Sequence, residues 1–281
     1  MAIDRIELTS GMRANLLSLQ RTAQSIDKTA SRLSSGLKVQ SALDDPIAYF
    51  AAQGHTQRAT DLALRKDEMG EAIQTIKAAN NGVEALTDLL ASLKSVAQSA
   101  LSAEGTTDIN ALETQYNTII GQIDDLVADS FYKGINLLND ESITVNFDEA
   151  GNSTLTVSGF DATATGLALD FEIVTDDWNS TTTGGSPDTT EINADIALID
   201  TALSTIRSET QQLSNNLSTI TIREDFTDNM INTLEEGAAN LTLADLDEEG
   251  ANLLMLQTRQ ALAQTSLSIT SQAAQGVLRL F

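Results

Sequence analysis

The chain has 281 residues, of which 41% are apolar and only 4% aromatic, and it contains 2 prolines and no cysteine. Its 40 acidic and 16 basic side chains give a net charge of −24, so we expect neither nucleic acid nor a membrane as a partner. The lack of cysteine excludes disulfides and thiol chemistry, and the scarcity of proline and aromatic residues favours long helices over a compact α/β enzyme.

The N-terminal segment is polar and lacks the apolar stretch of a cleavable signal peptide. No window approaches the ~20 apolar residues that span a bilayer, so we expect a soluble protein that is cytoplasmic or exported without such a signal. From residue 12 onward, apolar side chains alternate between four-residue and three-residue spacings, which predicts a helix with a coiled-coil seam. The members of this run are Met12, Leu16, Leu19, Ala23, Ile26, Ala30, Leu33 and Leu37.

A break in the helix is expected between about residues 34 and 46, because Gly36 and Pro46 interrupt the pattern. Asp45 before Pro46 favours either a turn or a new helix with proline at its first position. A second run with the same spacing extends from residue 69 to 100 and predicts a helix roughly 45–50 Å long. Its members are Met69, Ala72, Ile76, Ala79, Val83, Leu86, Leu90, Leu93, Ala97 and Ala100.

The middle of the chain changes from helical to β periodicity. Residues 104–108 indicate a helix end and a new start, and a shorter helix is expected through residues 112–126. Apolar and polar residues then alternate around the turn-forming segment 148–152, which predicts a β-hairpin, and residues 175–190 are polar and of low complexity, which indicates an exposed loop. The hairpin positions are Ile143, Val145, Phe147, Leu155 and Val157, and a further strand is expected over Leu167, Leu169, Phe171 and Ile173.

A third coiled-coil run and a terminal helix complete the chain. Gly237 and a capping box starting at Thr242 are expected to separate the two, with Glu248 and Glu249 in the first turn of the last helix, where the helix dipole favours acids. The third run comprises Ile192, Ile196, Ile199, Leu203, Ile206, Leu213, Leu217 and Ile220. Apolar positions of the terminal helix include Leu253, Leu256, Leu267, Ala274, Val277 and Phe281.

The sequence therefore predicts a mainly α protein with long antiparallel helices, a terminal coiled coil and a small β-hairpin region. The N- and C-terminal domains are expected to be discontinuous. Residues 1–45 and 242–281 would form paired terminal helices, residues 46–135 and 191–241 a helical bundle, and residues 136–190 the hairpin region with its short variable loop.

The terminal helices are expected to need further copies of the chain. Burying one apolar stripe of each helix gains less free energy than ordering both segments costs. We therefore predict that residues 1–40 and 250–281 are disordered in the monomer and fold on polymerisation. The expected self-assembly core is Met12, Leu16, Leu19, Ile26, Leu33, Leu37, Leu253, Leu256, Leu267, Val277 and Phe281.

No arrangement of residues predicts catalysis, a cofactor or a metal site. His55 is the only histidine, so neither a histidine-based triad nor a zinc site can be built. Adjacent acidic pairs such as Asp44 and Asp45 point to different faces and lack the spacing of a calcium loop. The chain is not expected to be an enzyme.

Several short segments, in order along the chain, are similar to one family of proteins. They cover residues 32–39, 41–45, 80–82, 96–100, 131–138 and 272–279, including Arg-Leu-Ser-Ser-Gly-Leu-Lys-Val at the first and Gln-Ala-Ala-Gln-Gly-Val-Leu-Arg at the last. On these motifs the chain resembles bacterial flagellin, in a short form that lacks large outer domains.

The resemblance implies a structural subunit that polymerises with many copies of itself into the extracellular flagellar filament, the propeller for swimming. It implies secretion by the flagellar type III apparatus, and contact with an export chaperone and with cap and junction proteins. It also implies that the terminal helices line the filament core. Two other functions remain open at this point, a hook–filament junction protein and a cytoplasmic coiled-coil scaffold.

Two further expectations follow from the resemblance. Flagellins detected by the mammalian innate receptor carry two arginines where this chain has Ala91 and Leu93, so weak or absent receptor activation is expected. The serines and threonines of the exposed loop are either a plain loop or sites for O-linked sugars. The candidate residues are Ser180, Thr181, Thr182, Thr183 and Ser186.

Overall fold

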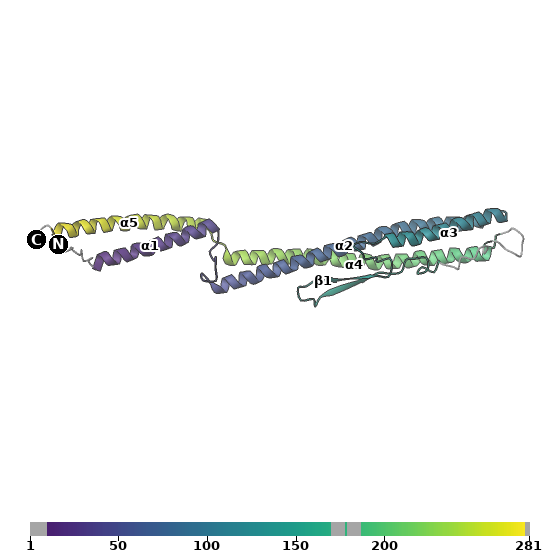
Figure 1. Ribbon diagram of the computed structural model, residues 1–281, viewed down its shortest axis with the longest axis horizontal. Helices are drawn as coiled ribbons and strands as arrows, with labels where there is room; N and C mark the ends of the chain where they lie inside the picture. The colour runs from purple at the N-terminus through teal and green to yellow at the C-terminus, as the bar shows by residue number, and fades with distance from the viewer. Residues whose placement is uncertain (1–9, 170–177, 179–186, 279–281) are drawn as a thin grey trace. The chain divides into compact units, whose positions relative to one another are not determined.

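The computed structural model describes residues 10–169, 178 and 187–278, and its helices and strands confirm a mainly α protein with a small β-hairpin (Figure 1). Contacts divide the chain into two compact units, one from residues 1–57 and 233–281 and one from residues 58–232. The elements are α1 (Ser10–Ser35), α2 (Pro46–Ala100), α3 (Thr106–Asp129), β1 (Ser142–Asn146), β2 (Thr154–Ser158), α4 (Thr189–Thr242) and α5 (Leu246–Leu278).

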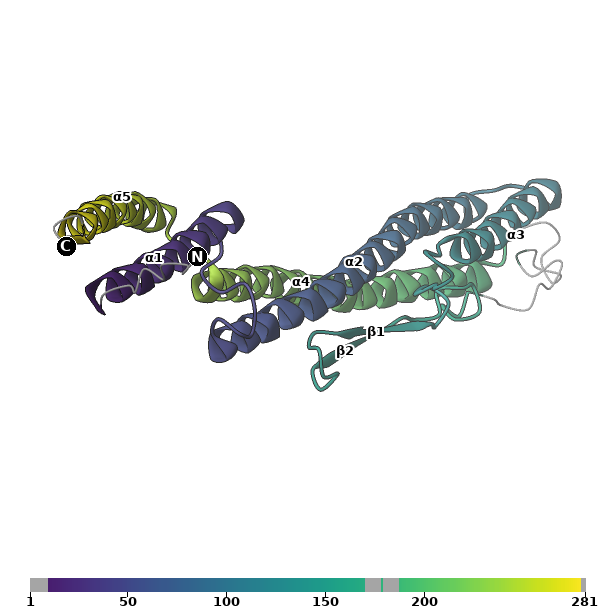
Figure 2. The ribbon, with the colours of Figure 1, turned by 60° about the vertical axis from the view of Figure 1, so that its left-hand side comes forward.

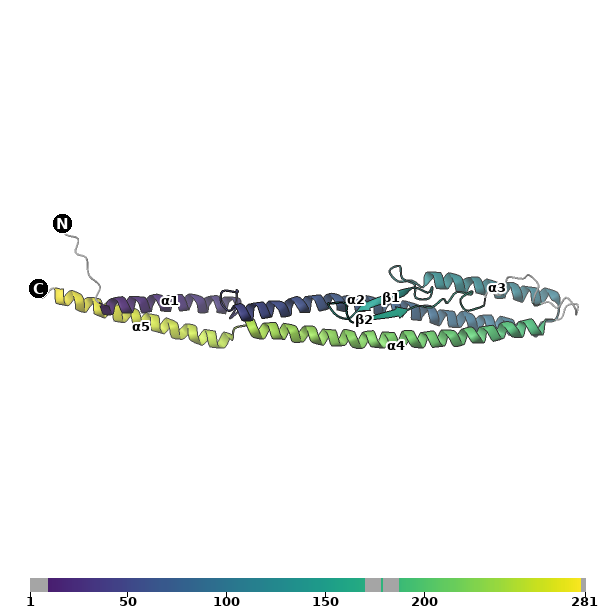
Figure 3. The ribbon, with the colours of Figure 1, turned by 90° about the horizontal axis from the view of Figure 1, so that it is seen from below.

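In the first unit, α1 and α5 lie side by side and run antiparallel (Figures 1 and 3). The segments that follow α1 and precede α5 are also joined, by an antiparallel bridge between Leu37 and Leu243. The amide of Lys38 donates to the carbonyl of Thr242 at 2.7 Å, and the amide of Ala244 donates to the carbonyl of Gly36 at 2.9 Å. The two ends of the chain therefore form one structure.

The predicted helix break between residues 34 and 46 is confirmed. Gly36 has a φ of 71° and its amide donates to the carbonyl of Arg32, which is the usual way for a glycine to end a helix. Asp45 then caps α2, because its Oδ1 accepts from the amides of Ile47 and Ala48, and Pro46 is the first helical residue.

The predicted start of the last helix is wrong in detail. The hydroxyl of Thr242 donates to the carbonyl of Ala238 within α4, and α4 continues through Gly237. Asp245 is the cap instead, since its Oδ1 accepts from the amides of Asp247 and Glu248 at 3.0 and 3.2 Å. Glu248 and Glu249 lie in the first turn of α5, as expected.

In the second unit, α2, α3 and α4 surround one apolar core (Figure 2). Every member of the predicted 69–100 run is buried, which confirms the second coiled-coil seam. On α4 the fully buried isoleucines and leucine recur every seven residues, at Ile192, Ile199, Ile206, Leu213 and Ile220. The predicted length of α2 is too short, because 55 residues span about 80 Å and residues 46–68 are helical without a strict apolar repeat.

The predicted hairpin is confirmed, with Ile143 opposite Val157 and Val145 opposite Leu155. Its inner face is buried through Val145 and Val157. The hairpin is joined to α2 by an ion pair between Arg58 and Glu149 at 2.6 Å. The guanidinium of Arg223 on α4 lies over the ring of Phe147, 5.3 Å from its centre.

The additional strand predicted over residues 167–173 is wrong where the structure describes it. Leu167 and Leu169 are buried, but they lie in and just after a turn in which the amide of Leu169 donates to the carbonyl of Ala164. Asp161 Oδ1 starts this turn by accepting from the amide and hydroxyl of Thr163. Phe171 and Ile173 lie outside the described residues.

Candidate functional site

The site predicted for self-assembly lies on α1 and α5. Their pairing buries Met12 but leaves Leu16 and Leu33 exposed. The side chain of Val277 and the whole of Phe281 lie outside the described residues. The remaining predicted residues are half-buried, namely Leu19, Ile26, Leu37, Leu253, Leu256 and Leu267.

The seam of α1 keeps the predicted Met12, Leu19 and Ile26 but differs at the positions between them. Thr22 and Thr29 are buried, whereas Ala30 is exposed and Ala23 is only half-buried. The hydroxyl of Thr22 donates to the carbonyl of Ser18 at 2.9 Å, so its polar atom is satisfied within the helix. These threonines were missed because only apolar residues were counted, although they keep the same seven-residue spacing.

A second apolar stripe on α5 was also missed, and it stays exposed when α1 and α5 pair. Its members are between 53% and 67% exposed, although each is a leucine, methionine or isoleucine. From residue 250 to 278 the only charged side chain is Arg259, so the stripe is almost free of charge. The stripe comprises Leu254, Met255, Leu262 and Ile269. A helix with apolar residues on more than one face is suited to burial among several neighbours.

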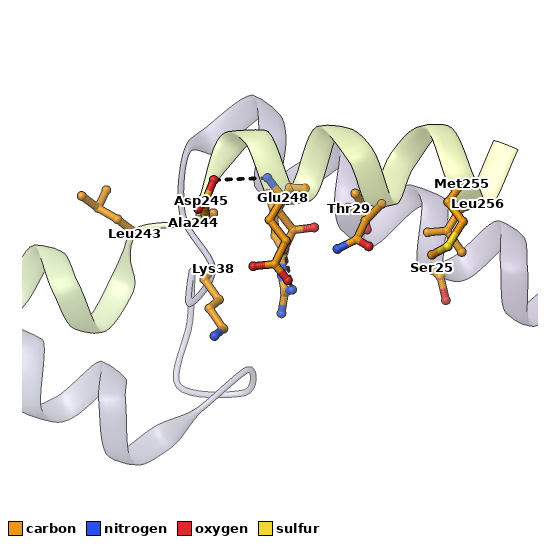
Figure 4. A pocket seen from close by; sticks show the side chains of 12 residues that line it. Ser25, Thr29, Lys38, Leu243, Ala244, Asp245, Glu248, Met255 and Leu256 are labelled. Carbon is orange, nitrogen blue, oxygen red and sulfur yellow. Dashed lines mark hydrogen bonds and ion pairs between the residues drawn. The ribbon is translucent and has the colours of Figure 1, made fainter.

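An ion pair joins the last turn of α1 to the first turn of α5. Arg32 Nη1 donates to Glu249 Oε1 at 2.9 Å, and Glu249 is buried. Arg32 Nε is buried without a hydrogen-bond partner among the described residues. The pair lies beside a pocket of about 470 Å³ whose wall includes Thr29, Lys38 and Glu248 (Figure 4). No sequence periodicity could indicate a pair this far apart in the chain.

In the second unit, Trp178 and Asp188 contact each other and the neighbouring helices. The Trp178 indole donates to Asp195 Oδ2 at 2.6 Å, and its ring lies 4.8 Å from that of Tyr116. The amide of Asp188 donates to the carbonyl of Trp178 at 2.8 Å. Trp178 is 2% exposed, so it anchors the loop to the helices. The five candidate residues for O-linked sugars lie outside the described residues.

Burial and the nearby charge of Asp195 both act on Tyr116. Burial raises the pKa of the Tyr116 hydroxyl well above its ordinary value, and the charge of Asp195 adds to the effect. Tyr116 therefore stays neutral at any physiological pH and acts here as a packing residue.

Other candidate chemistry is not supported by the described part of the chain. Within it, no three histidine, aspartate or glutamate side chains are placed to hold a metal ion, and no helix is both long and apolar enough to cross a membrane. Of the two positions compared with the receptor-binding arginines, Ala91 is exposed and Leu93 is fully buried.

Comparison with known proteins gives a consistent result. Residues 7–142 match the model of the bacterial flagellin N-terminal helical region. Flagellin FljO and flagellin FljM of Caulobacter vibrioides are 27% and 28% identical over all of both chains. The flagellin of Brucella melitensis is 26% identical over 95% of both. The crystal structure of Bacillus cereus flagellin aligns with a TM-score of 0.46 and 16% identity, over 57% of this chain and 88% of that one.

The helical termini and the full-length matches define a structural protein of the bacterial flagellum. The chain is similar to bacterial flagellins along its full length, and these relatives indicate a structural subunit of the flagellar filament. The predicted family and function are confirmed, and the hook–filament junction alternative is not favoured. Flagellins are structural proteins, which argues against an enzyme.

Proposed function

We propose that subunits join in the filament through the exposed apolar faces of α1 and α5. The observation that supports this most directly is the charge-free stripe Leu254, Met255, Leu262 and Ile269, which is more than half exposed in the single chain. Burying such a stripe against further helices removes apolar surface from water without desolvating any charge. The residues Leu16 and Leu33 of α1 belong to the same assembly surface.

The terminal segments 1–40 and 250–281 become ordered only when subunits assemble. The pairing of α1 with α5 leaves most of the predicted seam half-buried, so the pair gains too little to offset the entropy of ordering both helices. Amide hydrogen exchange decides this point. Rapid exchange in the dilute monomer and protection in the filament are expected, and protected termini in the monomer would contradict the proposal.

The subunit is secreted by the flagellar export apparatus and forms the filament outside the cell. On the way it meets an export chaperone and the junction and cap proteins, as the similarity to flagellins implies. Filaments on the cell surface, and loss of the protein from the medium when flagellar export is blocked, are the expected results. Retention in the cytoplasm would instead support a scaffold function.

Two finer properties are proposed with their own tests. The subunit activates the innate flagellin receptor weakly or not at all, because Ala91 and Leu93 replace the arginines. Strong signalling in reporter cells would contradict this. The serines and threonines of segment 180–186 carry no sugars, and an intact filament mass above that of the chain by sugar units would show glycosylation instead.

Substitution of the stripe tests the main proposal. The triple variant Leu254→Ser, Leu262→Ser and Ile269→Ser should raise the critical concentration for polymerisation at least ~10-fold, because each truncated contact costs on the order of 1 kcal/mol. The matched control replaces the exposed residues Gln257, Gln264 and Thr265 of the same helix by serine. The control should assemble normally. Normal assembly of the triple variant would contradict the proposal.

A further inference from the structure

The segment that begins α2 presents large apolar side chains to solvent. Leu43 is 97% exposed, Ile47 83% and Phe50 60%. We call these three residues the apolar cluster. A group of exposed apolar side chains on an ordered backbone is typical of an interaction site. The ring of Phe50 meets that of Tyr49, with centres 5.5 Å apart, but most of the apolar surface of the cluster stays in water. That exposed surface indicates a partner.

Local hydrogen bonds hold the turn that carries Leu43. Asp44 Oδ2 accepts from the amide of Gln40 and the hydroxyl of Ser41, both at 3.3 Å, and Asp44 also pairs with Lys28. The amide of Leu43 donates to Ser41 Oγ, also at 3.3 Å. Leu43 therefore projects into solvent from a hydrogen-bonded turn.

The same unit contains a surface that fits such a protrusion. An open groove of about 410 Å³, which we call the linker groove, is formed by the segment after α1 together with α2 and α4. It is large enough for a branched aliphatic side chain, and its wall contains no charged residue. The residues that line it are Leu37, Val39, Gln40, Tyr49, Ala52, Gln53, Thr56, Ala238, Ala239 and Thr242.

We infer that the apolar cluster of one subunit, led by Leu43, inserts into the linker groove of another copy of this chain. A helical filament requires a heterologous contact, in which one surface of each subunit meets a different surface of the next. The apolar cluster and the linker groove provide such a pair of surfaces on every copy.

Charge favours a second copy as the occupant. Each subunit carries a net charge of −24, so identical subunits repel each other over most of their surfaces. Neither the apolar cluster nor the linker groove contains a charged side chain. The acids next to the cluster are already engaged, Asp44 with Lys28 and Asp45 as the cap of α2. Contact here brings together two surfaces that carry no charged side chain.

Cross-linking tests the inference cleanly because the chain has no cysteine of its own. Full-length Leu43→Cys and Gln53→Cys variants are mixed, polymerised and oxidised, so that a bond between positions 43 and 53 can form only between subunits. We expect disulfide-linked dimers that contain one copy of each variant. The control mixes Leu43→Cys with Gln98→Cys, an exposed glutamine near the other end of α2, and should give no such dimer.

The outcome also distinguishes other arrangements. Dimers joined through two copies of position 43 would show that the cluster associates with itself, and filaments without any 43–53 dimer would show that the cluster serves another partner. Either result overturns the inference.

A second measurement uses no cysteine. Leu43→Asn should raise the critical concentration for polymerisation at least ~10-fold, whereas Leu43→Met should assemble like the natural chain. Unchanged assembly of Leu43→Asn would also overturn it.

Discussion

The guanidinium of Arg32 and the carboxylate of Glu249 are joined by a 2.9 Å hydrogen bond across 217 residues of sequence. The side chain of Glu249 is 10% exposed and that of Arg32 is 25% exposed, so this pair is better shielded than the other ion pairs described. Together with the backbone bridge between Leu37 and Leu243, it sets which turn of α1 meets which turn of α5.

Removal of one partner from this pair should be more costly than removal of both. Glu249→Ala leaves the Arg32 charge partly buried and should destabilise assembled subunits by about 1–3 kcal/mol. Arg32→Ala with Glu249→Ala should cost less than the sum of the single changes. Thermal depolymerisation of filaments of all four chains measures the coupling, and strictly additive effects would show that the pair contributes nothing.

The anchor at Trp178 should stabilise the second unit. Trp178→Ala removes a buried aromatic side chain and its hydrogen bond to Asp195, and should lower the free energy of unfolding by about 3–5 kcal/mol. Trp178→Phe keeps the ring contact with Tyr116 and should cost less. Denaturant unfolding followed by circular dichroism gives both values. A loss below ~1 kcal/mol for Trp178→Ala would mean that the loop base is not anchored here.

The contact between Glu71 and Lys133 should make stability depend on pH. Lys133 donates to Glu71 at 2.8 Å and the Tyr132 hydroxyl donates at 3.1 Å. The hydrogen bond from Lys133 lowers the pKa of Glu71 below its ordinary value of 4.5, and the hydrogen bond to Glu71 raises the pKa of Lys133 above 10.5. The contribution of Glu71 is present above its unfolded pKa and is lost as pH falls through the folded value. That of Lys133 is present below its unfolded pKa and is lost as pH rises through the folded value.

Glu71→Gln should therefore be less stable than the natural chain by a constant amount between about pH 6 and pH 9. The difference should shrink in acid below about pH 4.5 and in base above about pH 10.5. Unfolding across this pH range measures it. Glu84→Gln serves as control, because Glu84 is exposed and has no ion pair among the described residues. A difference that persists unchanged into acid would contradict the assignment.

Two glycines should respond in opposite ways to alanine. A Cβ on Gly82 would lie 2.5 Å from Ser130 Oγ and 2.6 Å from Leu138 Cδ1, so Gly82→Ala should cost about 1–3 kcal/mol. At Gly121 of α3 nothing lies within 4 Å of the added atom, so Gly121→Ala should gain about 0.5–1 kcal/mol. Chemical unfolding of both variants checks the pair, and equal effects would rule out a close approach at Gly82.

Much of the helical architecture could be predicted because coiled-coil periodicity is a local signal. The run from Met69 to Ala100 and the hairpin through Val145 and Val157 were both found from spacing alone. The strand expected at Leu167 and Leu169 was wrong because the alternation of apolar and polar residues indicates only which side chains are buried. A turn fixed by Asp161 buries the same two residues. The cap at Asp245 was missed because Thr242, three residues earlier, is also a residue type that caps helices.

The sequence by itself determined the coiled-coil runs of α2 and α4 and the resemblance to flagellin, since periodicity and short motifs are written in neighbouring residues. Only the tertiary structure decided that Thr22 and Thr29 lie in the α1 seam, that Arg32 meets Glu249, and that Leu43 stands exposed near an uncharged groove. The physical reason is that burial and pairing depend on what lies opposite a residue. For these side chains, the opposite surface comes from the far end of the chain or, as we infer, from another subunit.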